Sequence, residues 1–482
     1  MVEIVSFPRR ILLLLLLIAP LSSVLAQVVD DSDQPKQSAP AEKQKAPDQG
    51  RWKTETATGR SSGDVISAES EESGHEAKIK EQLPLEWKFY WHEGLHFWLQ
   101  KKAALLPGEP IPEQLRPKPK LQGKIGSVLQ IDAAAFVGGD DFEGFSDDII
   151  LRRFRLYSKG QFFLWIPVYF KFQFDITKDS FYLNDGHLEF RNIPWIQTFT
   201  VGYLKAPFSL ERLESSRDTT FMERASPIDA FSPGFRPGFE GSGTRFGDRL
   251  TWALGWFADG ADADIGDVTK SDFRIIGRMT GLPVCLKDLH NNRLMHVGLS
   301  YSYVNSSGNA VQYQSRPESR VAPTAVDTGG IPADRANLLD AEIAFVVNSL
   351  CFQGEYLHSI VNPVEGGTLH FNGYYAYVSY FPTGETRPYD TTRGIFTRVR
   401  PNKHFSFRNR TYGGLEIEAR YSHLDLDDGD VNGGKMNIIT AGVTWYLSPI
   451  FKLKFNYGNA YIDNREAAGR VNIFQGRFEI DL

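Results

Sequence analysis

The sequence predicts an all-β protein, a 16-stranded antiparallel transmembrane β-barrel. Three observations support this fold class. From residue 122 onward, about sixteen segments alternate apolar and polar residues with a period of two, as strands do. The connections between these segments alternate between short and long. Aromatic residues also gather at the segment ends, as the interfacial girdles of a barrel in a bilayer require.

The N-terminus predicts export through a cleaved signal peptide, and the predicted membrane barrel then indicates the cell outer membrane as the destination. Arg9 and Arg10 precede an apolar run at residues 11–19, and Ala26 closes a small-residue cleavage site, so residues 1–26 are interpreted as a signal peptide. The apolar run is too short for a spanning helix, which needs roughly 20 residues. Residues 27–84 are rich in Gln, Pro, Lys, Glu and Ser and carry almost no large apolar side chains, which predicts a disordered periplasmic linker.

Residues 85–121 are predicted to form a short hairpin before the barrel. The hairpin contains a literal H-E-x-x-H motif at residues 92–96, a spacing that holds zinc when it lies on a helix. Gly94 interrupts the motif and strand-forming aromatic residues flank it, so two polar residues in an aromatic hairpin are the favoured interpretation. Neither a cofactor nor an enzymatic activity is predicted. The sequence leaves open whether Cys285 and Cys351 pair.

Residues 122–482 are predicted to be the outer-membrane porin β-barrel. Phe170, Phe172 and Phe174 alternate with Lys171 and Gln173, and several later segments behave alike. A soluble sandwich alternates too, but an even number of segments near ten residues favours a membrane barrel with an aqueous lumen. The expected strands are 122–136, 150–159, 168–177, 183–192, 198–205, 240–247, 250–258, 271–281, 293–304, 338–347, 351–360, 370–381, 411–423, 434–447, 450–460 and 471–482.

Two connections are unusually long. Residues 206–239 form the third outer loop, with four arginines against five acidic residues. Residues 382–410 lie on the periplasmic side by strand counting, with seven basic residues against two acidic ones. Segments of this length inside a compact domain are usually functional or disordered. Both are therefore candidates to fold inward and narrow the lumen. The net charge of −6 argues against a nucleic-acid partner.

Several segments carry a family resemblance, and their order and spacing are specific. They are LRRFRL (151–156), VGYLKAPFSLERLESSRDTTFMER (201–224), GTRFGDRLTWALGWFADG (243–260), YFPTGETRPYD (380–390), GGLEIEARYSHLDL (413–426) and RFEIDL (477–482). The chain resembles the phosphate-selective porin O and P family. That resemblance implies a homotrimer of sixteen-stranded barrels with inward-folded loops. It also implies an outer-membrane porin with a water-filled channel for passive diffusion of small, phosphate-like anions.

The resemblance also implies the site residues. Lys205 and Ser209 resemble the family's central binding residues, Arg217 resembles its constriction-loop arginine, and Arg152 and Arg153 resemble its barrel-wall pair. Basic groups replace the hydration of an anion by charge-assisted hydrogen bonds and must release it again. Because Arg152 and Arg153 are adjacent, strict alternation would send one of them towards lipid unless a bulge intervenes. The full candidate set is Lys205, Ser209, Arg217, Arg224, Arg152, Arg153, Arg316 and Arg320.

Partners and alternatives follow from this interpretation. The expected partners are small inorganic anions such as phosphate, outer-membrane lipid and further copies of the chain. One alternative is a structural or adhesive barrel with no open channel, plugged by residues 382–410 and the hairpin around residues 87–99. The other is an enzyme, either one with zinc at His92 and His96 or a barrel hydrolase. The balanced charges of residues 206–239 leave the strength of anion selectivity open.

Overall fold

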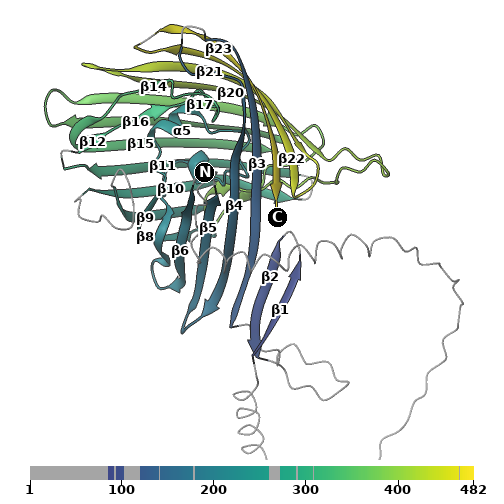
Figure 1. Ribbon diagram of the computed structural model, residues 1–482. Helices are drawn as coiled ribbons and strands as arrows, with labels where there is room; N and C mark the ends of the chain where they lie inside the picture. The colour runs from purple at the N-terminus through teal and green to yellow at the C-terminus, as the bar shows by residue number, and fades with distance from the viewer. Residues whose placement is uncertain are drawn as a thin grey trace, which may run out of the picture. The chain divides into compact units, whose positions relative to one another are not determined.

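Sixteen antiparallel strands close into a barrel in the computed structural model (Figure 1). The first of them, β3, pairs with the last, β23, between Gly138–Val471 and Val128–Asp481, so the ring is complete. The strands are β3 (Leu121–Gly138), β4 (Asp148–Phe163), β5 (Pro167–Ile176), β6 (Phe181–Ile193), β7 (Gln197–Lys205), β8 (Phe235–Arg245), β9 (Leu250–Ala258), β10 (Phe273–Asp288), β11 (Asn291–Asn305), β15 (Ile331–Val347), β16 (Leu350–Pro363), β17 (Leu369–Tyr380), β20 (Gly414–Asp428), β21 (Val431–Tyr446), β22 (Phe451–Asp463) and β23 (Ala468–Asp481).

The structure describes residues 85–91, 94–101, 120–139, 142–176, 180–259, 272–288, 291–307, 309–465 and 467–482. The predicted signal peptide, the predicted linker and the residues His92 and Glu93 lie outside these ranges. Among the described residues, no helix is both long and apolar enough to cross a membrane.

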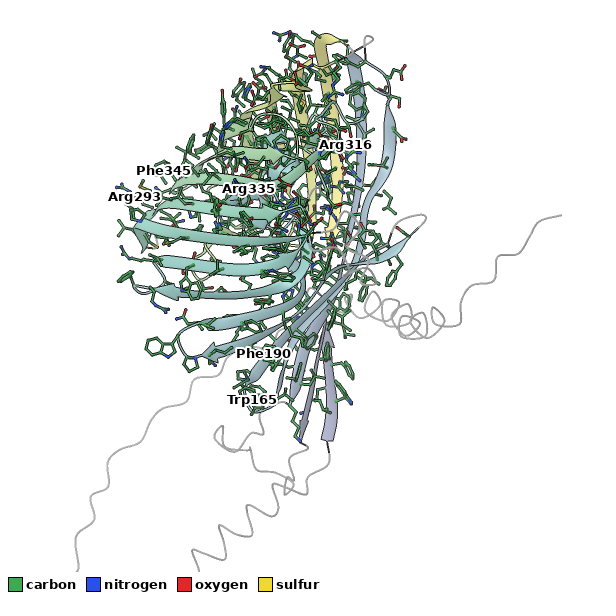
Figure 2. The ribbon with its side chains drawn as sticks, turned by 90° about the vertical axis from the view of Figure 1, so that its left-hand side faces the viewer. Trp165, Phe190, Arg293, Arg316, Arg335 and Phe345 are labelled. Carbon is green, nitrogen blue, oxygen red and sulfur yellow. The ribbon has the colours of Figure 1, made fainter. Side chains whose placement is uncertain are left out.

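Alternation along the strands places apolar side chains outside and polar side chains inside. Leu299 is 67% exposed on the outer face, whereas Arg477 is 2% exposed on the inner face. This is the reverse of a soluble protein and is what a lipid-facing surface around a polar lumen requires. Figure 2 shows Phe345 on the outer surface, and Trp165 in the short turn between β4 and β5. The predicted sixteen-stranded barrel is therefore confirmed.

The strands differ from the predicted ones mainly in length. β8 begins at Phe235, where it pairs with Lys205, and not near residue 240 as predicted. Gly234, Pro237 and Gly238 hide the strand pattern in the sequence, yet the pairing with β7 continues through Pro237 and Gly238. The connection between β7 and β8 is therefore residues 206–234, called the constriction loop below.

Three long connections fold against the inner face of the barrel. The constriction loop contains the short helices α4 (Leu210–Leu213) and α5 (Ser226–Phe231). The 306–330 loop contains the two-residue strands β12 (Ala310–Val311), β13 (Gln314–Ser315) and β14 (Val326–Asp327). The 381–413 loop, at the end of the barrel with the short turns, contains β18 (Tyr389–Asp390) and β19 (Ile395–Phe396).

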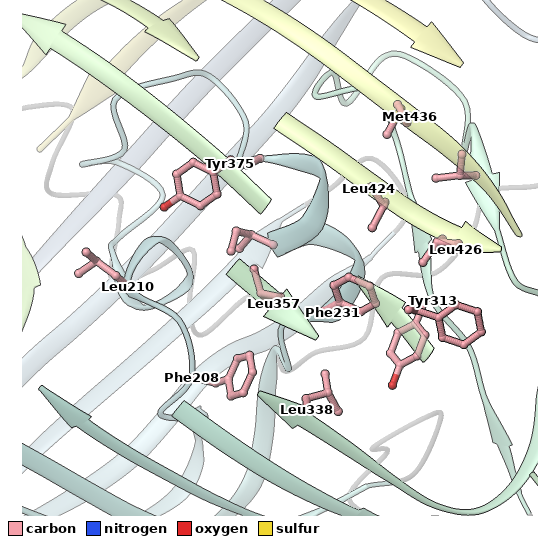
Figure 3. Packing of buried hydrophobic residues seen from close by; sticks show 14 of the residues in the cluster. Phe208, Leu210, Phe231, Tyr313, Leu338, Leu357, Tyr375, Leu424, Leu426 and Met436 are labelled. Carbon is pink, nitrogen blue, oxygen red and sulfur yellow. The ribbon is translucent and has the colours of Figure 1, made fainter. Parts of the chain in front are cut away.

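An apolar cluster fixes the constriction loop to one side of the barrel (Figure 3). Phe208 and Leu210 of the loop are fully buried, and Phe231 of α5 is 3% exposed. Burial of side chains of this size contributes about 1.5–3 kcal/mol each. Their apolar partners come from β15, β16, β17, β20, β21 and the 306–330 loop: Leu338, Leu357, Tyr375, Leu424, Leu426, Met436 and Tyr313.

A hairpin of β1 (Leu85–Trp91) and β2 (Leu95–Lys101) extends the sheet beside β3. β2 pairs with residues 121–125 of β3, just beyond the point where Leu482 bonds to Ser127. Gly94 has a φ of +125°, which favours glycine. His96 lies on β2 with its ring stacked on Tyr90 at 4.6 Å between centroids, so this histidine of the H-E-x-x-H motif lies on a strand.

Candidate functional site

A cavity of about 2010 Å³ lies inside the barrel, between the wall strands and the inward-folded loops. The β4–β8 wall contributes one side, and the constriction, 306–330 and 381–413 loops contribute the other. Sixteen Lys and Arg residues line the cavity against nine Asp and Glu residues. The lining is therefore strongly basic, although the chain as a whole carries a net charge of −6.

Salt bridges neutralise a larger share of the acidic lining residues than of the basic ones. Six of the nine acidic residues pair with described basic residues, for example Asp185 with Lys171 at 2.5 Å and Glu189 with Arg191 at 2.5 Å. Half of the basic residues have no such compensation, so their charge remains available to an ion in the lumen. Eight lining residues form no salt bridge with a described acid: Arg153, Lys159, Lys205, Arg212, Arg224, Arg316, Arg320 and Arg393.

Lys205 and Arg224 meet at one carbonyl group. Lys205 Nζ and Arg224 Nη2 each donate to the Glu214 carbonyl oxygen at 3.0 Å. Lys205 also donates to Leu213 O at 3.3 Å, and Arg224 Nε donates to Glu211 O at 3.0 Å. Carbonyl groups orient both side chains, so two basic groups lie together beside the cavity.

Arg152 and Arg153 both line the cavity because β4 contains a β-bulge. Gln130 of β3 pairs with Arg153, and Ile131 pairs with Leu151, which leaves Arg152 as an extra residue. Arg152 forms a two-pronged contact with Glu223 of the constriction loop, at 2.8 and 3.0 Å. Arg153 instead donates to the neutral side chain of Gln130. The two adjacent arginines therefore have different surroundings.

Glu223 is held in its charged form. Burial acts to raise the pKa of Glu223, but the nearby charges of Arg152 and Arg477 lower it well below its ordinary value. Arg477 of β23 contacts the same carboxylate at 2.6 Å. Glu223 therefore joins the constriction loop to the wall strands β4 and β23 as a carboxylate.

Wall cations also hold the backbone of the constriction loop. Lys454 of β22, 1% exposed, donates to the carbonyl oxygens of Thr220 at 3.0 Å and Phe221 at 3.2 Å. Charge-assisted bonds of this kind are stronger than those between neutral groups. The further donor–acceptor pairs from the wall are Lys452 to Arg217 O, Arg420 to Glu223 O and Arg477 to Met222 O, and Arg387 of the 381–413 loop donates to Asp218 O.

Comparison with known proteins places this barrel in a family. Residues 124–482 match the family described as phosphate-selective porin O and P. The chain belongs to that family. It is also 23% identical over 379 residues to Porin O of Pseudomonas aeruginosa, which covers 70% of this chain and 83% of that protein. A further relative, an uncharacterized protein of Caulobacter vibrioides, is 29% identical over 360 residues, covering 69% of this chain and 68% of that protein.

Solved porin structures are similar to the barrel at low sequence identity. An anion-selective porin from Comamonas acidovorans is 12% identical, with a TM-score of 0.47 over 75% of this chain and 100% of that chain. OmpT, an outer membrane protein of Vibrio cholerae, is 10% identical, with a TM-score of 0.48 over 77% of this chain and 100% of that chain. Family and fold together make the protein an outer-membrane porin and point to a channel rather than an enzyme.

The porin brings most of the sequence-predicted site residues to the cavity. Lys205, Arg152, Arg153, Arg217, Arg224, Arg316 and Arg320 line it. Arg217 is paired there with Asp481 of β23 at 3.1 Å. In the 306–330 loop, Arg316 Nε donates to Ala322 O at 3.1 Å, and Arg320 is exposed. Figure 2 shows Arg316 well away from Phe345 on the outer surface.

Ser209 is placed differently from the other predicted residues. It is fully buried and is not among the residues that line the porin cavity. Its Oγ accepts a hydrogen bond from Arg212 N at 3.1 Å, and it caps α4 with a φ of +67°. The structure therefore gives Ser209 a role in shaping the loop.

Sequence reasoning missed two sets of basic residues in the porin. Lys159, Lys171 and Arg212 line the cavity but were not predicted as site residues, whereas Arg393 and Arg400 belong to residues 382–410, a segment that was predicted to fold inward. The polar face of the wall strands was a usable signal, because inward-facing positions alternate with the apolar ones. The same signal would have found the loop-holding residues Arg420, Lys452, Lys454 and Arg477 on β20, β22 and β23.

Proposed function

We propose that this porin is a passive channel that prefers small inorganic anions, with phosphate-like ions as the leading class. The observation that carries the proposal is the basic excess of the cavity lining in a chain that is acidic overall. A water-filled path with uncompensated Arg and Lys groups concentrates anions and repels cations.

The uncompensated residues suggest a route for the anion. Arg316 and Arg320 belong to the 306–330 loop, Arg153 lies on the wall, Lys205 ends β7 and Arg224 belongs to the constriction loop. Each can offer charge-assisted hydrogen bonds to an oxyanion. Several such groups in succession allow the ion to leave one site as it meets the next, which a conducting pore requires.

The experiment that tests the function is a reversal-potential measurement in a planar bilayer across a KCl gradient. We expect the sign of the reversal potential to correspond to chloride permeation. We also expect added inorganic phosphate to inhibit the chloride current. Lys205→Met should lower the ratio of anion to cation permeability, because it removes an uncompensated charge from the lining. A matched control is Lys435→Met, because Lys435 is neutralised by Asp425 at 2.9 Å and does not line the cavity.

Two outcomes would contradict the proposal. Purified protein that gives no opening events would favour the plugged structural or adhesive barrel. A wild-type channel with cation preference would leave the porin fold intact but exclude the anion path. If Lys205→Met conducts like the wild type while the wild type is anion-selective, Lys205 lies off the route.

We also propose that the protein acts as a homotrimer after removal of residues 1–26, as the family resemblance and the N-terminal sequence imply. Residues 27–84 then form a periplasmic linker. Mass spectrometry of the mature protein should give a chain that begins at Gln27, and sedimentation in detergent should give three chains per particle. A monomer in detergent would contradict the homotrimer. A mature chain that retains Met1 would contradict the removal of residues 1–26.

A further inference from the structure

Three carboxylates lie together on the inner wall, behind the constriction loop. Asp340 and Glu342 come from β15 and Glu355 comes from the neighbouring strand β16. One ligand oxygen from each lies within 4.8 Å of the other two. All three side chains are buried, at 2%, 4% and 3% exposure. The cluster is separate from the cavity, because none of its members lines it.

Two of the three carboxylates have hydrogen-bond partners. Arg278 of β10 contacts both oxygens of Glu342, at 2.8 and 2.6 Å, and His296 and Ser300 contact the same group at 3.0 and 3.1 Å. Glu355 accepts hydrogen bonds from the backbone N–H groups of two residues of the constriction loop and from a tyrosine: Leu210 at 2.9 Å, Glu211 at 2.8 Å and Tyr375 at 2.5 Å.

Asp340 is the exception. Neither of its oxygens accepts a hydrogen bond from a described residue, although the side chain is almost fully buried and its carboxylate faces Glu342 and Glu355. Arg278 is the basic side chain that the described contacts place on this cluster, so three carboxylates share one guanidinium group. A buried carboxylate without a partner is costly, and such groups are normally paired or coordinate a metal.

We propose that Asp340, Glu342 and Glu355 form a binding site for a hard divalent cation, with calcium as the best-fitting ion. Carboxylate oxygens are the ligands that such cations prefer. Calcium binds oxygen at about 2.3–2.6 Å, so ligands on opposite sides of it lie about 4.6–5.2 Å apart. The three ligand oxygens lie within 4.8 Å of one another, which is close enough for one such ion to contact all three. The cation supplies the positive charge that Asp340 lacks.

The proposed site goes beyond ion conduction, because it couples the wall to the constriction loop. Glu355 is both a cation ligand and the acceptor for the N–H groups of Leu210 and Glu211. A cation bound by Asp340 and Glu355 therefore fixes the Glu355 carboxylate, which accepts the hydrogen bonds from the start of the constriction loop. Its role is to position the loop, and the permeating anion does not contact it.

The test uses the full mature chain, unfolded in EDTA and refolded into detergent in chelated buffer, because the site is buried. Calcium chloride is added to one sample before refolding and to another sample after refolding, and unbound calcium is then removed from both. We expect one calcium per chain by elemental mass spectrometry and a Tm several degrees higher than in EDTA, since a ligand that binds the folded state stabilises it. In Asp340→Asn, the bound calcium and the calcium-dependent Tm shift should both be lost.

Glu365→Gln is the matched control, because Glu365 is an exposed carboxylate in the turn between β16 and β17. The Glu365→Gln protein should bind calcium, and calcium should raise its Tm as it does in the wild type. Absence of calcium from the refolded wild type, together with an unchanged Tm, would overturn the proposal and indicate a protonated Asp340. Equal calcium binding by Asp340→Asn would overturn it too. If Asp340→Asn does not refold, the wild-type stoichiometry alone decides.

Discussion

Replacement of Arg420 by methionine is expected to release both the constriction loop and the 306–330 loop from the wall and to raise the single-channel conductance. Arg420 of β20 is 1% exposed in its side chain and contacts Glu211 at 3.4 Å and Glu318 of the 306–330 loop. It also donates to Glu223 O at 3.1 Å. The methionine leaves Glu211 and Glu318 as buried carboxylates without their cation.

The expected loss is large, because removal of one partner of a buried ion pair costs about 3–5 kcal/mol. The barrel strands keep their pairing, so the cost falls on the attachment of the loops. We expect larger and noisier openings in planar bilayers, with closures at lower voltage than in the wild type. Arg420→Lys keeps the charge but loses the planar fork, so its effect should be intermediate.

Arg335→Met provides the matched control for Arg420→Met. Arg335 lies on β15, is exposed, and makes a hydrogen bond to Asn362 at 3.3 Å. Its replacement should change neither conductance nor gating. If Arg420→Met kept the wild-type conductance and voltage dependence, the inward position of the loops would have to depend on the apolar cluster alone.

The adjacent residues Arg152 and Arg153 are expected to separate selectivity from loop attachment. Arg153→Gln removes a charge that no described acid neutralises. A charge at contact distance from an ion in a hydrated pore is worth about 1 kcal/mol, which corresponds to roughly a fivefold change in local anion concentration. The anion-to-cation permeability ratio should fall accordingly, while glutamine keeps a donor for Gln130.

The comparison is the double replacement Arg152→Gln with Glu223→Gln, which removes a neutral pair. It should leave the permeability ratio close to that of the wild type but lower the Tm, because the constriction loop loses a two-pronged contact with β4. Reversal potentials and thermal unfolding of both proteins check the two effects. A double variant that loses selectivity as strongly as Arg153→Gln would contradict this division of roles.

The fold was largely predictable because the periodicity of each strand is a local property. In segments such as 415–421, apolar residues alternate with Glu416, Glu418 and Arg420, and the bilayer sorts the two faces in the same way around the ring. The start of β8 was missed because Pro237 and Gly238 give no alternation of their own. Local patterns thus determine which segments are strands but not where each one begins.

The candidate site was less predictable, since the role of an arginine depends on what faces it across the lumen. Arg217 pairs with Asp481, which lies 264 positions away in sequence. Arg152 reaches Glu223 because of a β-bulge that the residue types in the sequence do not predict. The balance of four arginines and five acids in residues 206–239 is also misleading, because Arg420 of the wall binds Glu211 away from the cavity, and Arg152 and Arg477 neutralise Glu223 at the cavity lining.

Asp481 links the seam between β23 and β3 to the width of the lumen. It belongs to the strand that seals the barrel, and its carboxylate pairs with Arg217 of the constriction loop and with Arg398 of the 381–413 loop. The strand that completes the ring of hydrogen bonds is therefore also an attachment point for two loops that narrow the lumen from its two ends. A change at the end of the last strand bears on the width of the channel as well as on the closure of the barrel.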